Sequence, residues 1–123
     1  MQDSVIHINK GIAKLESKDY VNAIFEFNQA VMIDPNNEST YLGRGMAYIA
    51  QGNYTKAISD LNKAIEIDPN CGRAYYLRGE LKFHLEDKSG ACQDWREVAE
   101  LGFKEYYEMT KDHRKNSNLI FYA

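Results

Sequence analysis

The sequence has few of the residues that hold small secreted or metal-binding proteins together. Its 123 residues include only two cysteines, Cys71 and Cys92. Neither their number nor their spacing matches a disulfide framework or a zinc knuckle. We therefore expect both to be free thiols, buried or half-buried, because nothing near either one is typical of a redox-active cysteine.

Long apolar runs and an excess of positive charge are also missing. No apolar run approaches the roughly 18 residues that a membrane-spanning helix needs, and the first residues lack a basic region followed by an apolar core. The formal net charge of -3 gives no general attraction to nucleic acid or anionic lipid. We expect a cytoplasmic protein that binds neither nucleic acid nor membrane, although removal of a signal peptide would leave the same pattern.

Motifs for catalysis and cofactor binding are absent as well. The eight glycines are spread along the chain, so there is no phosphate-binding loop. The three histidines fall in different predicted elements, and no serine or cysteine stands in a nucleophile motif. Carboxylates recur at steps of three in residues 94–100, which we interpret as a solvated helix face rather than a cation site. The sequence predicts a non-catalytic protein without cofactor or bound metal.

What the sequence does contain is an internal repeat. Gly11, Gly45 and Gly79 stand 34 residues apart, and Asp34-Pro35-Asn36 falls on Asp68-Pro69-Asn70 under the same shift. Alanines and bulky residues align with them: Ala23, Ala57 and Ala91; Phe27, Leu61 and Trp95; Ala30, Ala64 and Val98. A fixed period of this length predicts a stacked-repeat architecture.

Each repeat is predicted to be a helical hairpin. Apolar residues recur at steps of three and four over residues 4–17 and again over 20–33, where Asp34-Pro35 ends the second helix. The second hairpin is expected at about 37–51 and 54–67, with its turn at Gly52-Asn53. The third is expected at about 72–85 and up to 101, with its turn at residues 86–88. A seventh helix is predicted over 104–113, and the final NSNLIFYA segment either docks or frays.

On these residues the chain resembles the tetratricopeptide repeat family, whose 34-residue pattern is W-x2-L-G-x2-Y, then A-x3-F, then P. The middle repeat carries the pattern at Tyr41, Gly45, Tyr48, Ala57, Leu61 and Pro69, and Arg44 replaces the usual leucine. The resemblance implies an all-α, right-handed superhelical solenoid of three helix-turn-helix hairpins in a single domain, 1–123. The repeats would span about 4–37, 38–71 and 72–105, followed by a capping helix and tail in 104–123.

The resemblance also implies a concave groove, lined by the first helix of each hairpin, that grips an extended peptide or partner segment. The candidate groove residues are Ile8, Ile12, Leu42, Gly43, Met46, Arg73, Tyr76, Leu77 and Glu80. Most are apolar, and an exposed apolar patch on a soluble protein usually marks an interaction site. The same residues would instead be core if a neighbouring helix or the C-terminal tail covered them.

One subtype of the family, the carboxylate clamp, holds the C-terminus of a chaperone with lysines, asparagines and an arginine. The clamp would need Lys and Asn in place of Ile8 and Ile12, Asn in place of Gly43 and Arg in place of Leu77; only Arg73 fits. We therefore predict an adaptor or scaffold that binds an apolar peptide or helix of a protein partner without a clamp. The alternative is self-association through the same apolar surface, which would give a homo-oligomer.

Overall fold

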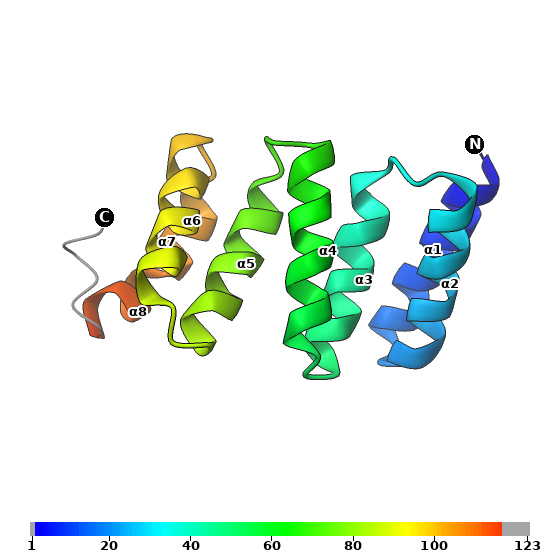
Figure 1. The fold of residues 1–123 in the computed structure, drawn as a ribbon, viewed down its shortest axis with the longest axis horizontal. Coiled ribbons are helices and arrows are strands. Elements are labelled where there is room, and N and C mark those ends of the chain that lie inside the picture. The colour runs from blue at the N-terminus through cyan, green and yellow to red at the C-terminus, as the bar shows by residue number, and fades with distance from the viewer. Residues whose placement is uncertain (1, 117–123) are drawn as a thin grey trace. The chain divides into compact units, whose positions relative to one another are not determined.

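The computed structural model describes residues 2–116, and this part of the chain consists of helices joined by short turns (Figure 1). It divides into two compact units, Met1–Pro69 and Asn70–Ala123, with the boundary near the predicted junction of the second and third repeats. None of the helices in residues 2–116 is long and apolar enough to cross a membrane. The predicted all-α repeat fold is confirmed, while the single domain stays a prediction.

The first unit contains two helical hairpins. They are formed by α1 (Gln2–Glu16) with α2 (Tyr20–Ile33) and by α3 (Glu38–Ala50) with α4 (Tyr54–Ile67). The helices of each hairpin pack together, and α3 also contacts α1 and α2. The predicted limits of α2 and α4 are confirmed, whereas α1 begins two residues before the predicted start.

The second unit contains one hairpin and two short helices. Its elements are α5 (Gly72–His84), α6 (Lys88–Glu100), α7 (Lys104–Met109) and α8 (Lys111–Asn116). The prediction of one seventh helix over 104–113 is therefore wrong. Thr110 causes the break: its hydroxyl donates to the Tyr107 carbonyl at 2.6 Å, and its backbone N–H bonds the same oxygen at 3.1 Å. Such local bonds compete with the regular helical pattern.

The turn inside each hairpin repeats residue by residue. A side-chain oxygen caps the second helix of each hairpin by accepting a hydrogen bond from the backbone N–H of the residue three positions later. The capping residues are Asp19, Asn53 and Asp87. The residue before each cap has a left-handed φ: 63° at Lys18, 77° at Gly52 and 67° at Glu86. Glycine takes this conformation without a Cβ penalty. The repeat therefore fixes the turn as well as the helices.

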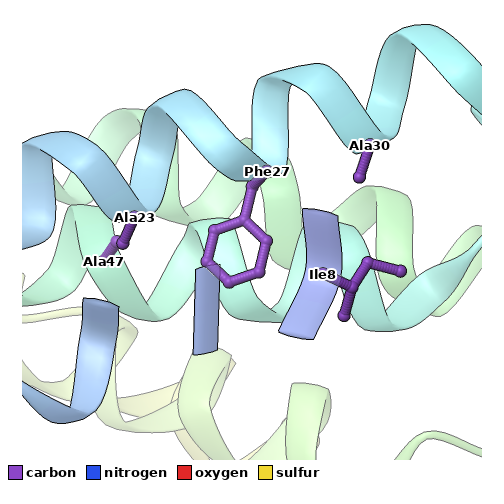
Figure 2. Packing of buried hydrophobic residues seen from close by; sticks show 5 residues of the cluster. All are labelled: Ile8, Ala23, Phe27, Ala30 and Ala47. Carbon is purple, nitrogen blue, oxygen red and sulfur yellow. The ribbon is translucent and has the colours of Figure 1, made fainter. Parts of the chain in front are cut away.

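The core of the first unit is organised around Phe27. This fully buried ring extends from α2 among four smaller neighbours, Ile8, Ala23, Ala30 and Ala47 (Figure 2). Two glycines lie against the ring. A Cβ on Gly11 would stand 2.7 Å from Phe27 Cε1, and one on Gly43 would stand 2.5 Å from Phe27 Cζ. Both distances are shorter than van der Waals contact, so Phe27 occupies the space that a side chain would need.

The size of the facing residue decides how strictly each repeated glycine is needed. In the third hairpin, a Cβ on Gly79 would stand 2.4 Å from Nε1 of the buried Trp95. In the second hairpin Leu61 occupies the same position, and a Cβ on Gly45 would lie at an ordinary 3.5 Å from its Cδ2. Glycine is therefore sterically required opposite the aromatic residues, whereas a Cβ would also fit opposite leucine.

Candidate interaction faces

In the first unit, the predicted groove positions fall on one side of α1 and one side of α3, two helices that contact each other. Helical spacing puts Val5 and Ile12 together on α1, and Leu42 and Met46 together on α3. Ile12 is 43% exposed, and Leu42 and Met46 are half-buried. We call Val5, Ile12, Leu42 and Met46 the α1–α3 face, because apolar atoms of all four reach the surface.

Ile8 and Gly43 do not lie on this face, which corrects the sequence-based expectation. Ile8 is only 6% exposed and belongs to the cluster around Phe27. Gly43 is buried, with the Phe27 ring where its side chain would be. Both residues were assigned to the groove by their position in the family pattern. That pattern does not specify how far the side chain of Phe27 extends from α2. They support the α1–α3 face from beneath.

In the second unit, the candidate residues lie on α5, where α7 and α8 cover part of them. Arg73 is exposed, whereas Tyr76, Leu77 and Glu80 are half-buried. The ring of Tyr76 stacks on Tyr106 of α7, with centroids 5.2 Å apart. Burial raises the pKa of the Tyr76 hydroxyl, and the nearby Glu80 carboxylate raises it further.

Glu80 of α5 contacts α8 through His113. Its Oε2 lies 3.5 Å from Nε2 of His113, whose ring also packs 4.5 Å from the centroid of Phe83. Its Oε1 is buried without a hydrogen-bond partner among residues 2–116. Burial raises the pKa of the Glu80 carboxyl, and the opposing effects of His113 and His84 are smaller. The candidate groove residues of α5 are thus partly covered by the chain's own C-terminal helices. The question whether the final segment docks or frays concerns residues 117–123, which lie outside the described residues.

Two ion pairs that the sequence analysis missed each join a half-buried arginine to a buried aspartate. One pair connects the two helices of the second hairpin, and the other connects the two helices of the third hairpin. Arg44 Nε and Nη2 donate to Asp60 Oδ2 and Oδ1 at 2.9 and 2.8 Å. The hydrogen bond with Asp60 raises the pKa of the Arg44 guanidinium. Arg44 Nη1 also donates to Asn28 of α2 at 2.9 Å, so this side chain connects the first two hairpins.

The equivalent pair in the second unit joins Arg78 to Asp94, with Nε and Nη2 donating at 2.9 and 2.7 Å. Lys82 adds a second cation at 3.2 Å from Asp94 Oδ2. Asp94 is therefore buried and paired, and its assignment to a solvated acidic face is wrong. The signal was available in the sequence, because opposite charges stand at the same two positions in every repeat, beginning with Lys10 and Glu26.

Comparison with solved structures gives strong fold matches over nearly the whole chain. The first TPR of Spaghetti (RPAP3), bound to the HSP90 peptide SRMEEVD, is 28% identical, with a TM-score of 0.87 over 97% of this chain and 94% of that one. The Sgt2 TPR domain from Aspergillus fumigatus is 28% identical, with a TM-score of 0.83 over 96% and 83%. The Arabidopsis OM64 TPR domain, at 23% identity, has a TM-score of 0.90 over 95% and 98%.

The fold and its exposed faces define a helical-repeat module for protein–protein interaction. Tetratricopeptide repeat models match residues 5–37 and 39–71, together more than half of the sequence. The chain therefore belongs to the tetratricopeptide repeat family. A search of curated proteins found no significant match.

Proposed function

We propose that the α1–α3 face binds an apolar segment of a protein partner, and that it does so without a carboxylate clamp. The observation that carries this proposal is the Phe27 ring beneath Gly43, 2.5 Å from where a Cβ would stand. An asparagine at this clamp position would require the core of the first unit to rearrange. The remaining clamp positions of this unit, Ile8 and Ile12, offer no hydrogen-bond donor from their side chains.

The structural neighbour from Spaghetti is bound to SRMEEVD, a peptide with an acidic end. On the α1–α3 face such an end would lose hydration without gaining charged partners, which is unfavourable. The similar fold therefore supports peptide binding in general, while the side chains favour a different ligand. An apolar segment, extended or helical, matches the chemistry of Ile12, Leu42 and Met46.

The size of the face indicates a weak interaction. Two or three apolar anchors contribute about 1.5 to 3 kcal/mol each when fully buried, and association costs at least several kcal/mol. At most about 5 kcal/mol remains, which corresponds to a dissociation constant of a few tenths of a millimolar or weaker. Met46 adds an unbranched, polarizable side chain that adapts to differently shaped ligands.

A peptide selection tests the type of ligand. We expect selection from a random display library to yield apolar peptides, and amidation of their C-terminus to change affinity less than about twofold. A clamp would require the free carboxylate, so a large loss on amidation would contradict the proposal. The peptide SRMEEVD serves as the matched clamp ligand, for which we expect no saturable binding up to about 1 mM.

A charge placed on the face tests its location. Met46→Glu is expected to weaken binding of the selected peptides at least tenfold, which is about 1.4 kcal/mol, because the new carboxylate would be desolvated. Ser59→Glu is the matched control, since it adds the same charge at an exposed position of α4. Equal affinities for Met46→Glu and the unmodified chain, measured by calorimetry, would rule out the face.

A further inference from the structure

Helix α8 contacts α5 and α6 through one described side chain, His113. Its ring packs on Phe83 of α5, with centroids 4.5 Å apart, and on Trp95 of α6, with centroids 5.9 Å apart. Lys111 and Asp112, the other described side chains of α8, are exposed. Among the described side chains, the attachment of α8 therefore depends on one imidazole, a group that changes its charge between about pH 5 and 8.

Helix α7, by contrast, is attached by uncharged aromatic contacts. Tyr106 stacks on Tyr76 of α5, with centroids 5.2 Å apart, and Tyr107 packs against the cluster around Trp95. The two helices are separated at Thr110, whose hydroxyl donates to the Tyr107 carbonyl at 2.6 Å. This break allows α8 to detach while α7 stays in place.

A carboxylate lies beside the contact that His113 makes. Nε2 of His113 is 3.5 Å from Glu80 Oε2, and Glu80 Oε1 is buried without a hydrogen-bond partner among residues 2–116. Protonated His113 compensates the carboxylate charge, whereas neutral His113 leaves that charge uncompensated, which is unfavourable away from water. Burial raises the pKa of the Glu80 carboxyl, so the closed form also holds a proton there more tightly than an open, hydrated form. Both groups therefore favour closure when protonated, and closure weakens as the pH rises.

The surrounding titratable groups do not reverse this effect. His84 of α5 is exposed and gains positive charge on acidification, which also compensates the charge of Glu80. Burial raises the pKa of the Tyr76 hydroxyl, so this group stays neutral over the same range. Four further groups keep their charge state between about pH 5 and 8: Lys111 and Asp112 of α8, Tyr107 of α7 and the buried Cys92 of α6.

We propose that α8 is a pH-dependent cover of α5, closed at mildly acidic pH and increasingly open as the pH rises, with His113 as the contact that titrates. Opening would expose Phe83 and Glu80, which are the third-repeat equivalents of Ile49 and Met46 on α3. The second unit would then offer these groove positions to a ligand only in the open form. The cover does not require peptide binding at the α1–α3 face.

The expected change is modest, because the pair is partly hydrated. The His113 and Glu80 side chains are 43% and 27% exposed. We expect acidification from about pH 8 to about pH 5.5 to shift the equilibrium of α8 about threefold towards the closed form. The aromatic contacts of His113 contribute a similarly small amount, so a measurable fraction of the chain is expected to be open at pH 8.

Trp95 provides the readout for opening. It is the only tryptophan in the sequence and is fully buried, with His113 stacked on it. Acrylamide is an uncharged fluorescence quencher that reaches the indole more readily when α8 is open. Divided by the fluorescence lifetime, the quenching constant is expected to be about twofold higher at pH 8 than at pH 5.5. His113→Ala removes the attachment and should give a high value at both pH values, which defines the open form.

Two variants remove the pH dependence in different ways. His113→Phe keeps an aromatic ring without a charge, so its quenching constant should stay close to the pH 8 value of the unmodified chain at both pH values. Glu80→Gln removes the carboxylate and should also abolish the dependence. His7→Asn is the matched control, because it removes a histidine that pairs with Glu26 at 2.8 Å in the first unit, and no change is expected. Met46→Glu should have no effect either, which separates the cover from the proposed peptide binding.

A quenching constant that is equal at pH 5.5 and pH 8 in the unmodified chain would overturn the cover. Dependence on pH that persists in both His113→Phe and Glu80→Gln would overturn the role of the pair. A folded His113→Ala variant with the quenching constant of the unmodified chain would show that α8 does not shield Trp95. Circular dichroism checks the fold, and if His113→Ala loses helical signal, the other two variants decide the outcome.

Discussion

Equivalent repeat positions differ between the two units in how accessible they are to a ligand. On α3 of the first unit, Leu42 and Met46 contribute to a face that no neighbouring helix within its unit covers completely. The equivalent residues on α5 are Tyr76 and Glu80, and these contact Tyr106 of α7 and His113 of α8. The hairpin therefore determines where a side chain stands, while the segment that follows decides whether a ligand can reach it.

Beneath these faces the units share their internal construction. Each has a glycine packed against an aromatic ring, Phe27 in the first unit and Trp95 in the second. Each also has a half-buried arginine paired with a buried aspartate between the helices of a hairpin. The stability changes caused by substitutions at these positions therefore measure how similar the cores of the two units are.

The largest effect is expected from removing the ring at the centre of the first unit. Phe27→Ala should lower the free energy of unfolding by about 3 to 5 kcal/mol, because a fully buried ring leaves a cavity. Phe25→Ala on the same helix is the matched control; this residue is exposed, so a change within about 0.5 kcal/mol is expected in dilute solution. Denaturant unfolding measures both. Equal losses would contradict the central role of Phe27.

The next effect distinguishes the two ion pairs. Arg44→Leu restores the residue usual in the family, yet we expect it to cost about 3 kcal/mol, because Asp60 stays buried without its partner. Arg78→Leu should cost less, since Lys82 remains 3.2 Å from Asp94. Thermal and denaturant unfolding would compare them. Equal costs for Arg44→Leu and Arg78→Leu would mean that Lys82 does not compensate for the lost arginine. The double variant R44L/D60L should recover most of the stability that Arg44→Leu loses.

A smaller effect separates the two glycines of α3. Gly43→Ala should cost about 1 to 3 kcal/mol, because its Cβ would overlap the Phe27 ring. Gly45→Ala, two residues on, meets only ordinary contacts. It should stabilise the helix by up to about 1 kcal/mol, since alanine is the better helix former. A tolerated Gly43→Ala would show that Phe27 can move and would weaken the argument against a clamp.

The smallest effect concerns the covered face of α5. The folded chain raises the pKa of Glu80, so it binds protons more tightly there than the unfolded chain, and stability falls as the pH rises through that pKa. Glu80→Gln removes this penalty. The variant should be more stable than the unmodified chain at pH 7, by less than about 1 kcal/mol, and this difference should shrink towards pH 4. A difference that grows on acidification, measured by thermal unfolding at several pH values, would contradict the assignment.

The sequence predicted most of the backbone, because repetition ties many positions together. The limits of α2 and α4 follow from apolar periodicity and from the Asp-Pro pairs, which are local signals. The seventh helix was predicted as one element since nothing local distinguishes Thr110 from other helical threonines until its hydroxyl bonds the Tyr107 carbonyl. Opposite charges recur at the positions of Arg44 and Asp60 in every repeat. The pairing went unrecognised because the two residues lie on different helices, and only the packing of these helices brings them into contact.

By itself the sequence determined the all-α repeat, the family and the apolar character of the groove positions, since periodicity and side-chain chemistry are carried by single residues and their spacing. Only the tertiary structure decided which of those positions are surface. Burial depends on neighbours far away in the chain: Phe27 fills the space at Gly43, and α8 reaches Glu80. The same dependence leaves Val21, Phe25 and Met32 of α2 exposed, although such apolar residues are typical of a core.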